Sequence, residues 1–284
     1  MITVIHHDDM DGRCSAAIVR LFSARKDNID FVEMTYKDPL ELDKVKGSGT
    51  VYVVDFSLQN PGDWERLIES VPHVIWIDHH ASAIAKPGPQ NDLPGLRALD
   101  SGSAAMLVYK YLMNSEDAPR ALQLVSDFDT WAWEKKNDLE PVHFMYGMQA
   151  LPDEPESRMW TELLTSASSN KRIDEIVEIG KHIKEVKRRN DEHHLKNFSF
   201  ETEFEGRPAL AVCLGESSSF SFGDSITKYP FLIAFCEDGE KYKVSVYTKD
   251  PQLNLSKILM KYGGGGHSGA GGFTCMKLPF KHAQ

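Results

Sequence analysis

Short apolar runs that stop abruptly at acidic or histidine residues recur through the first half of the chain, and they restrict the fold more than any other feature. The three clearest are Ile2–Ile5, Val51–Val54 and His73–Ile77. Segments with apolar residues at helical spacing accompany them, for example over residues 15–22 and 103–113. Short apolar strands that alternate with helices predict a mainly parallel sheet with helices on both faces. The sequence therefore predicts an α/β protein that binds its ligand at the carboxyl edge of this sheet.

One long amphipathic helix separates the two halves of the chain. Its apolar stripe extends from Lys171 to about Asn197, and its later turns are basic. We expect two domains, a larger one over residues 1–170 and a smaller α/β one over residues 198–284, with residues 171–197 as the connector helix. The Pro152–Pro155 stretch is an alternative hinge.

The smaller domain ends in a glycine-rich loop. An Asp238-Gly239 turn between two strand-like runs predicts a β-hairpin, and a helix expected over residues 253–262 leads into the loop over residues 263–272. The seven glycines of this loop either permit tight turns or let backbone amides approach phosphate oxygens closely. Because one His and one Ser lie among them, we favour the second interpretation. The loop is not a Walker A motif, because no Lys-Ser or Lys-Thr follows the glycines.

The charge of the chain argues against nonspecific binding to duplex nucleic acid, which requires a basic face. The formal net charge is -10, and residues 198–284 contain nine basic and nine acidic residues, so the whole surplus of ten acids lies in residues 1–197. Surplus carboxylates usually form a solvated face, but they can also gather around bound cations. The positions of the aspartates decide between these two interpretations.

Three further features concern the compartment. No apolar run approaches the roughly 20 residues that are needed to cross a bilayer. The N-terminus lacks the basic and apolar segments of a secretory signal. The four cysteines, Cys14, Cys213, Cys236 and Cys275, lie far apart and form no CxxC pair. We therefore expect reduced thiols in a cytoplasmic protein that does not bind membranes.

Four clusters contain the residue types of metal ligands, and we expect each at the end of an apolar strand. They are His7-x-Asp9-x-Asp11-Gly12, Asp55, Asp78-His79-His80 and Ser126-Asp127-Phe128-Asp129. A single Asp after a strand commonly forms a turn or caps a helix, but four clusters at strand ends favour a shared site. Carboxylate together with imidazole suits Mn²⁺, Fe or Zn better than Ca²⁺. The set also offers a bridging carboxylate and terminal ligands for two cations about 3.5–4 Å apart.

Together with the C-terminal run GGGGHSGAGGF, these clusters resemble the DHH phosphoesterases that carry a DHHA1 C-terminal domain, in the same order and over nearly the whole chain. The H-x-D-x-D-G form and the run Asp127–Trp131 are most similar to the nano-RNase B type of oligoribonuclease. The first motif differs from the nano-RNase A form, in which the His lies further from its aspartates. RecJ exonucleases are much longer, and family II pyrophosphatases have a different C-terminal domain without the GGGH loop.

The resemblance implies a centre with two Mn²⁺ ions, for which Mg²⁺, Co²⁺ or Fe²⁺ could substitute. Asp55 would bridge the ions, with His7 and Asp9 on the first ion and Asp11, His79 and Asp127 on the second. His80 would lie near the scissile phosphate as a hydrogen-bond donor or acid, and Asp78 would orient an imidazole. The residues implied to bind the substrate are Gly264, Gly265, Gly266, His267 and Ser268.

Two histidines and two aspartates near these clusters are open to alternative interpretations. His6 and His7 cannot both point into the site from one strand. The spacing to Asp9 favours His7, and we expect His6 to be a packed core histidine. Asp129 either replaces Asp127 as a ligand or caps the turn that follows.

Two smaller features beside the clusters have structural explanations. Trp131 and Trp133 are expected in the core, with base stacking as the alternative. Ser101-Gly102-Ser103 is explained by a helix cap, although it could also contact phosphate.

The predicted function is metal-assisted hydrolysis of phosphodiester bonds in short single-stranded oligonucleotides or small nucleotide phosphodiesters, with release of nucleoside 5′-monophosphates. The second domain would grip the terminal nucleotide across an interdomain cleft. A phosphatase acting on 3′-phosphoadenosine 5′-phosphate, a cyclic dinucleotide phosphodiesterase and an exopolyphosphatase would use the same metal site. A noncatalytic nucleotide-binding module is an alternative from another class. The sequence leaves a homodimer open.

Overall fold

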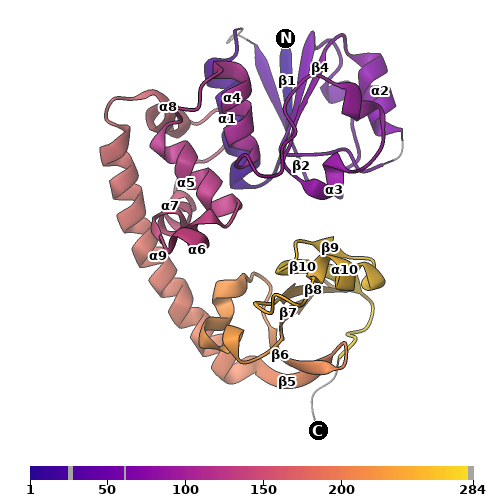
Figure 1. The fold of residues 1–284 in the computed structure, drawn as a ribbon, viewed down its shortest axis with the longest axis vertical. Coiled ribbons are helices and arrows are strands. Elements are labelled where there is room, and N and C mark those ends of the chain that lie inside the picture. The colour runs from indigo at the N-terminus through magenta and orange to yellow at the C-terminus, as the bar shows by residue number, and fades with distance from the viewer. Residues whose placement is uncertain (25–27, 61, 281–284) are drawn as a thin grey trace. The chain divides into compact units, whose positions relative to one another are not determined.

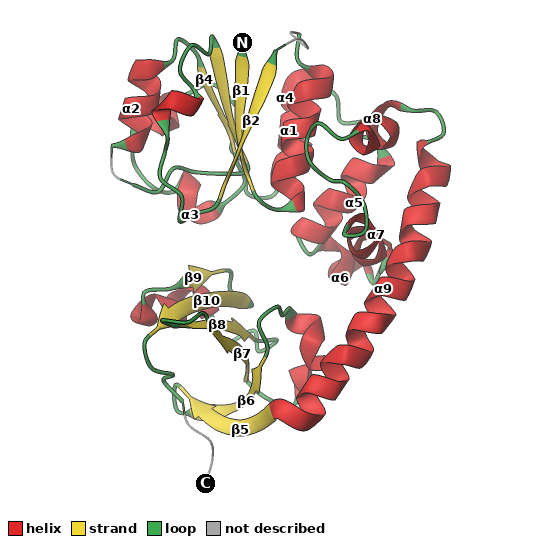
Figure 2. Ribbon diagram, turned by 180° about the vertical axis from the view of Figure 1, so that it is seen from behind, coloured by secondary structure: helices red, strands yellow, loops and turns green. Residues whose placement is uncertain are grey.

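The computed structural model describes residues 1–24, 28–60 and 62–280, and it confirms the α/β class. The chain forms two compact units, Met1–Ile183 and a second one that begins at Lys184. The division falls inside the long helix α9 (Ser169–Phe198), which covers the helix expected from Lys171 onward. Figures 1 and 2 show the elements of both units, which we describe one at a time.

The first unit is built on a four-stranded parallel sheet in the order β2-β1-β3-β4. The strands are β1 (Ile2–His7), β2 (Ile29–Met34), β3 (Thr50–Val54) and β4 (Val74–Ile77). Strand β1 is central, and its Val4 pairs with Phe31 on one side and with Tyr52 on the other. Since all four strands run in the same direction, the residues that follow them meet at one edge of the sheet.

Successive side chains of these strands point to opposite faces of the sheet. Both sets are buried because helices cover both faces of this parallel sheet. Val4 packs in the core beneath α1 (Met10–Phe22) and α4 (Ala104–Met113), whereas Ile5 packs in a second core with α2 (Asp63–Ser70). The short helix α3 (Ala81–Ile84) lies on the α2 side (Figure 1). Ser103 occupies the N-cap position of α4, as the sequence indicated.

The rest of the first unit is helical. It consists of α5 (Arg120–Asp129), α6 (Ala132–Lys136), α7 (Glu140–Met148), α8 (Arg158–Thr165) and the first half of α9. A Cβ atom on Gly180 of α9 would lie 1.7 Å from the His143 carbonyl oxygen of α7, so glycine permits these two helices to pack closely.

The cluster Ser126–Asp129 lies in the last turn of helix α5, so the expectation of a strand end there was wrong. The buried residues that precede it, Ala121, Leu122, Leu124 and Val125, follow a helical period. A short apolar run alone does not distinguish a buried helix from a buried strand.

The second unit contains a six-stranded sheet in the order β5-β6-β7-β8-β10-β9, in which only the pair β6–β7 is parallel. Its strands are β5 (Ser199–Phe204), β6 (Arg207–Cys213), β7 (Phe231–Glu237), β8 (Tyr242–Tyr247), β9 (Gly265–Gly266) and β10 (Ala270–Cys275). The predicted hairpin is confirmed, since β7 and β8 are antiparallel around Asp238-Gly239 and Gly239 has a φ of +90°. The helix expected before the glycine loop forms α10 (Leu255–Leu259) and a 3₁₀ turn (Met260–Tyr262).

Among the described residues, no helix is both long and apolar enough to span a membrane. All four cysteines are free thiols, as expected from their spacing.

Candidate metal centre

The carboxyl edge of the parallel sheet gathers the predicted ligands of the first unit into three groups. Within each group the ligand atoms lie within 4.8 Å of one another. The groups are His7, Asp9 and Asp55; Asp11, His79 and Asp129; and Asp55, His79 and His80. Asp55 and His79 each belong to two groups, so the three groups form one continuous site.

Asp55 lies at the centre of this site, directly after β3. Its backbone has a φ of +53°, a left-handed conformation that is uncommon outside glycine and that an aspartate tolerates better than most residues. The side chain is 1% exposed, and neither carboxylate oxygen accepts a hydrogen bond from the described residues. Burial, together with the carboxylates of Asp11 and Asp9, raises the pKa of Asp55 well above its usual range. An ionised Asp55 therefore requires a nearby positive charge.

His7, the last residue of β1, and Asp9, at the N-cap of α1, form one part of the site. His7 Nδ1 lies 2.7 Å from Asp9 Oδ2, and the backbone N–H of Gly12 donates to Asp9 Oδ1 at 2.9 Å. Loss of hydration alone would raise the pKa of Asp9. The hydrogen bonds with His7 and Gly12 have a larger, opposite effect and hold this pKa at about 2. Gly12 itself is required here, because a Cβ atom would lie 2.4 Å from the His7 carbonyl oxygen. Helix α1 can therefore begin directly against the end of β1.

Asp11 connects the site to the start of helix α4. Its two oxygens accept hydrogen bonds from the backbone N–H groups of Ala104 at 2.8 Å and Ala105 at 3.1 Å. These amides belong to the first turn of α4, where backbone donors have no partner within the helix. Asp11 is thus fixed in place, with Oδ2 at 3.9 Å from His79 Nε2.

The Asp78-His79-His80 run follows β4, and its three side chains make different contacts. Asp78 is fully buried, and its Oδ1 accepts from the backbone N–H groups of His79 and His80 and lies 2.8 Å from His80 Nδ1. Burial opposes protonation of His80, but the hydrogen bond with Asp78 outweighs it and raises the His80 pKa. Asp78 thus contacts the His80 imidazole, and its role in orienting that ring at a metal site stays a prediction.

The His79 imidazole lies among three carboxylates of the site. Its Nε2 lies 3.3 Å from Asp129 Oδ2, 3.4 Å from Asp55 Oδ1 and 3.9 Å from Asp11 Oδ2. Nine buried side-chain polar atoms of the described residues lack a hydrogen-bond partner, and five of them belong to Asp55, Asp78, His79 and Asp129. Buried polar atoms are normally satisfied, so this concentration matches a site whose partner is a cation. Oxygen and imidazole donors without thiolate suit Mn²⁺, Fe²⁺ or Zn²⁺ better than Ca²⁺.

Asp129, and not Asp127, is the carboxylate of α5 that the structure places in the site. Asp127 instead pairs with Lys136, at 2.6 Å between Oδ2 and Nζ. Residues i and i+2 of a helix point in different directions, so only one of the two carboxylates can reach His79. The geometry thus favours Asp129, the alternative that the sequence left open, and a ligand role for either residue stays a prediction.

The neighbouring aromatic and histidine residues were partly predicted. His6 is 1% exposed, and its Nδ1 lies 2.8 Å from the His7 carbonyl oxygen, which confirms the packed core histidine. Trp133 is buried as expected, but Trp131 is 39% exposed with a φ of +59°, so its placement in the core was wrong. Sequence reasoning missed Tyr36, whose ring lies 4.9 Å from that of His7. Its place just after β2, at the same sheet edge, was the available signal.

The predicted substrate-binding residues belong to the second unit. Gly265, Gly266, His267 and Ser268 are exposed, in β9 and the turn that follows it. Part of the glycine content has a packing role, since a Cβ atom on Gly271 would lie 2.4 Å from the Gly265 carbonyl oxygen. Binding of substrate by this loop, including Gly264, stays a prediction.

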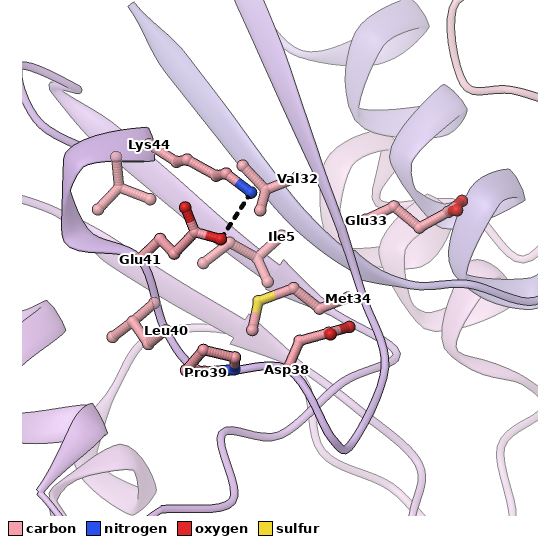
Figure 3. Close-up of a pocket in the computed structure, with 10 residues that line it drawn as sticks. Ile5, Val32, Glu33, Met34, Asp38, Pro39, Leu40, Glu41 and Lys44 are labelled. Carbon is pink, nitrogen blue, oxygen red and sulfur yellow. Dashed lines mark ion pairs between the residues drawn. The ribbon is translucent and has the colours of Figure 1, made fainter. Parts of the chain in front are cut away.

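A pocket of about 180 Å³ lies beside β1 and β2 (Figure 3). Its lining includes Ile5, Val32, Met34 and Leu40, with an ion pair of 3.0 Å between Lys44 and Glu41. None of its lining residues belongs to the three groups.

Comparison with known proteins finds a family model that matches the larger part of the first unit. Residues 1–130, which include every ligand of the three groups, match the family model described as DHH family, N-terminal domain. The N-terminal domain belongs to the DHH family. Its Asp78-His79-His80 run supplies two histidines and the buried aspartate that orients one of them.

Three similar proteins extend the comparison beyond the DHH domain. The chain is 26% identical to oligoribonuclease NrnB of Bacillus subtilis (strain 168), over 96% of this chain and 72% of the relative. The fold is similar to the DHH domain of a member of a family of ribosomal proteins, with a TM-score of 0.63, 16% identity and coverage of 96% and 82%. It is also similar to RecJ from Thermus thermophilus in complex with Mn²⁺, with a TM-score of 0.55, 17% identity and coverage of 97% and 49%.

Proposed function

We propose that this protein is a metal-dependent phosphodiesterase that hydrolyses short single-stranded oligonucleotides to nucleoside 5′-monophosphates. The observation that carries the proposal is the buried Asp55 carboxylate of the DHH domain, which accepts no hydrogen bond within the described residues and has ligand atoms of His7, Asp9, His79 and His80 around it. The similarity to an oligoribonuclease over 96% of the chain supports the substrate class. The net charge of -10 also suits a short substrate better than a long duplex.

The proposed centre holds two Mn²⁺ ions. His7 and Asp9 would hold one ion, Asp11, His79 and Asp129 would hold the other, and Asp55 would contact both. Bound divalent cations lower the pKa of water and neutralise negative charge on phosphate oxygens. The RecJ structure with Mn²⁺ supports this choice of metal, and Mg²⁺, Co²⁺ and Fe²⁺ have compatible ligand preferences.

His80 is the proposed proton donor. Hydrolysis forms a bond between a water oxygen and phosphorus, breaks the bond from phosphorus to the 3′ oxygen, and leaves a proton on that oxygen. Asp78 contacts Nδ1 of His80, so Nε2 is the ring nitrogen proposed to donate the proton. The same contact raises the pKa of His80 and thereby keeps the imidazole protonated to a higher pH. A positioned imidazole of this kind contributes roughly 10²–10⁴-fold to a proton-transfer step.

The second unit is proposed to bind the terminal nucleotide of the substrate. Its exposed residues Gly265, Gly266, His267 and Ser268 combine glycine backbone with two polar side chains, and the backbone N–H of His267 donates to the Ala270 carbonyl oxygen at 2.7 Å. Backbone N–H groups without a Cβ atom are suited to close contact with phosphate oxygens.

The test is turnover in Mn²⁺ on a panel of RNA and DNA oligomers of about two to five nucleotides, 3′-phosphoadenosine 5′-phosphate, cyclic dinucleotides and polyphosphate. We expect turnover of the linear oligomers, loss of that turnover in Asp55→Asn, and little change in the control variant Asp127→Asn. Release of inorganic phosphate from 3′-phosphoadenosine 5′-phosphate alone would replace the proposal by a phosphatase. Binding of nucleotides without turnover of any substrate would indicate a noncatalytic module.

A further inference from the structure

An exposed tyrosine lies beside the proposed metal centre. Tyr36 follows β2, so it reaches the same carboxyl edge of the sheet as the predicted ligands. The centre of its ring lies 4.9 Å from that of His7 and 6.4 Å from that of His80, which it meets edge-on at 87°. Tyr36 thus contacts one proposed metal ligand and lies close to the proposed proton donor.

The ring of Tyr36 is supported by a buried aromatic residue, and Tyr36 remains partly exposed. It stacks on Phe56 with 5.3 Å between ring centres and an angle of 16° between the planes. Phe56 is 1% exposed, and its carbonyl oxygen accepts a hydrogen bond from the Trp76 indole at 3.0 Å, so this support is fixed. Tyr36 itself keeps 44% exposure. A tyrosine that served only the core would be buried more deeply.

The backbone that carries Tyr36 is held in a tight turn. The N–H of Thr35 donates to Asp38 Oδ2 at 2.7 Å, the N–H of Asp38 donates to the Thr35 carbonyl oxygen at 3.1 Å, and the N–H of Lys37 donates to Thr35 Oγ1 at 3.2 Å. Asp38 also lines the pocket behind the turn (Figure 3). A ring held in this way loses little conformational entropy when a ligand contacts it.

The chemistry of the site indicates what the ring would contact. The sheet edge is rich in carboxylates, which bind phosphate only through a cation. A flat apolar surface beside such a centre provides binding energy that does not depend on phosphate. Stacking of a base on an aromatic ring tolerates every base, because every base has a π face.

We propose that Tyr36 binds the substrate by stacking its exposed ring face on a nucleobase next to the scissile phosphate. This inference rests on the proposed function and deepens it, since it makes the base, and not only the phosphate chain, part of what is recognised. The protein should then prefer nucleotide substrates over polyphosphate, with little preference among bases. The parallel arrangement of Tyr36 on Phe56 favours stacking of a third ring over a contact through the hydroxyl group.

The experiment compares Tyr36→Phe, which keeps the ring, with Tyr36→Ala, which removes it. The substrates are a 5′-phosphorylated RNA dinucleotide and two analogues that lack either the first or the second base. We expect Tyr36→Ala to lower kcat/KM on the dinucleotide by about 5- to 150-fold, the range for loss of one stacked base. Tyr36→Phe should stay within about twofold of the wild type. On one of the two analogues, the wild type and Tyr36→Ala should have equal kcat/KM.

Three results would overturn the proposal. Equal losses in Tyr36→Phe and Tyr36→Ala would assign the effect to the hydroxyl group. A loss of the same size on both base-free analogues, or reduced Mn²⁺ content, would make Tyr36 a support for His7. Unchanged kinetics in Tyr36→Ala would exclude a substrate contact.

Equilibrium binding separates this inference from the proposed function. In Mn²⁺, calorimetry with adenosine 5′-monophosphate and ribose 5-phosphate should show that Tyr36→Ala weakens binding of the nucleotide only. If the wild type hydrolysed no dinucleotide but this difference held, the proposed function would fail while the base contact would stand. If the variant weakened binding of both probes equally, or of neither, the base contact would fail.

Discussion

Replacement of Asp55 by asparagine should have opposite effects on stability with and without metal. Asp55 is 1% exposed, and burial together with Asp11 and Asp9 raises its pKa in the metal-free protein. An acid whose folded pKa lies above its unfolded value of about 3.9 loses protein stability as pH rises from that value through the folded pKa. At pH 7 the Asp55→Asn variant no longer carries this penalty, and its amide can donate to the neighbouring carboxylates. Without metal we therefore expect the variant to be more stable by about 1–3 kcal/mol.

With metal the order should reverse. A ligand at 100 times its Kd stabilises the folded state by about 2.7 kcal/mol, and Asp55 is a residue shared between two ligand groups. The wild type should gain this stability in Mn²⁺, and Asp55→Asn should gain little of it. For a unit of this size each kcal/mol corresponds to roughly 2–4 °C in Tm.

The assay is differential scanning calorimetry at pH 7 in EDTA and in Mn²⁺, with the transition of the DHH domain followed in each. Asp127→Asn is the matched control, because its carboxylate pairs with Lys136 outside the ligand groups, and it should show the wild-type response to Mn²⁺. The reasoning is refuted if Asp55→Asn is less stable than the wild type in EDTA and shows the same increase of Tm in Mn²⁺.

Three further predictions concern other residues of the two units. Asp129→Ala should lower Mn²⁺ content and reduce turnover at least about 100-fold, because it removes a proposed ligand. Asp127→Ala should cost no more than about 1 kcal/mol of stability. Equal metal content in the two variants would contradict the assignment of Asp129. Asp78 raises the pKa of His80, so Asp78→Asn should move the alkaline limb of the kcat profile to lower pH, and an unmoved limb would remove His80 as the acid. His267→Ala should lower kcat/KM on oligonucleotides by about 10- to 150-fold, which is equivalent to roughly 1.5–3 kcal/mol for a hydrogen bond to a charged group. Its Mn²⁺ content should be unchanged. Wild-type kinetics in this variant would leave the glycine loop with a packing role only.

The sequence predicted the sheet edge well because strand ends are local features. Apolar runs that stop at His7, Asp55 and Asp78 had to bring these residues to one edge once the strands were parallel. The choice between Asp127 and Asp129 was not local, since it depends on which side of α5 faces His79, and the run before them was interpreted as a strand.

The exposure of Trp131 and the position of Tyr36 escaped prediction for a related reason. Apolar content alone suggested burial for Trp131, but its left-handed backbone at the start of α6 leaves it at the surface. Tyr36 has no motif of its own, and its position beside His7 results from the order of β2 and β1 in the sheet. Strand order is a tertiary property that the sequence pattern did not determine.

The central claim is most directly tested by hydrolysis of a 5′-phosphorylated RNA dinucleotide in ¹⁸O-labelled water with Mn²⁺, with products identified by mass spectrometry. The proposed cleavage adds one labelled oxygen to the phosphate of one released nucleoside 5′-monophosphate, and Asp55→Asn should release none at a detectable rate. Label found only in inorganic phosphate, or equal release by the wild type and Asp55→Asn, would contradict a phosphodiesterase centred on Asp55.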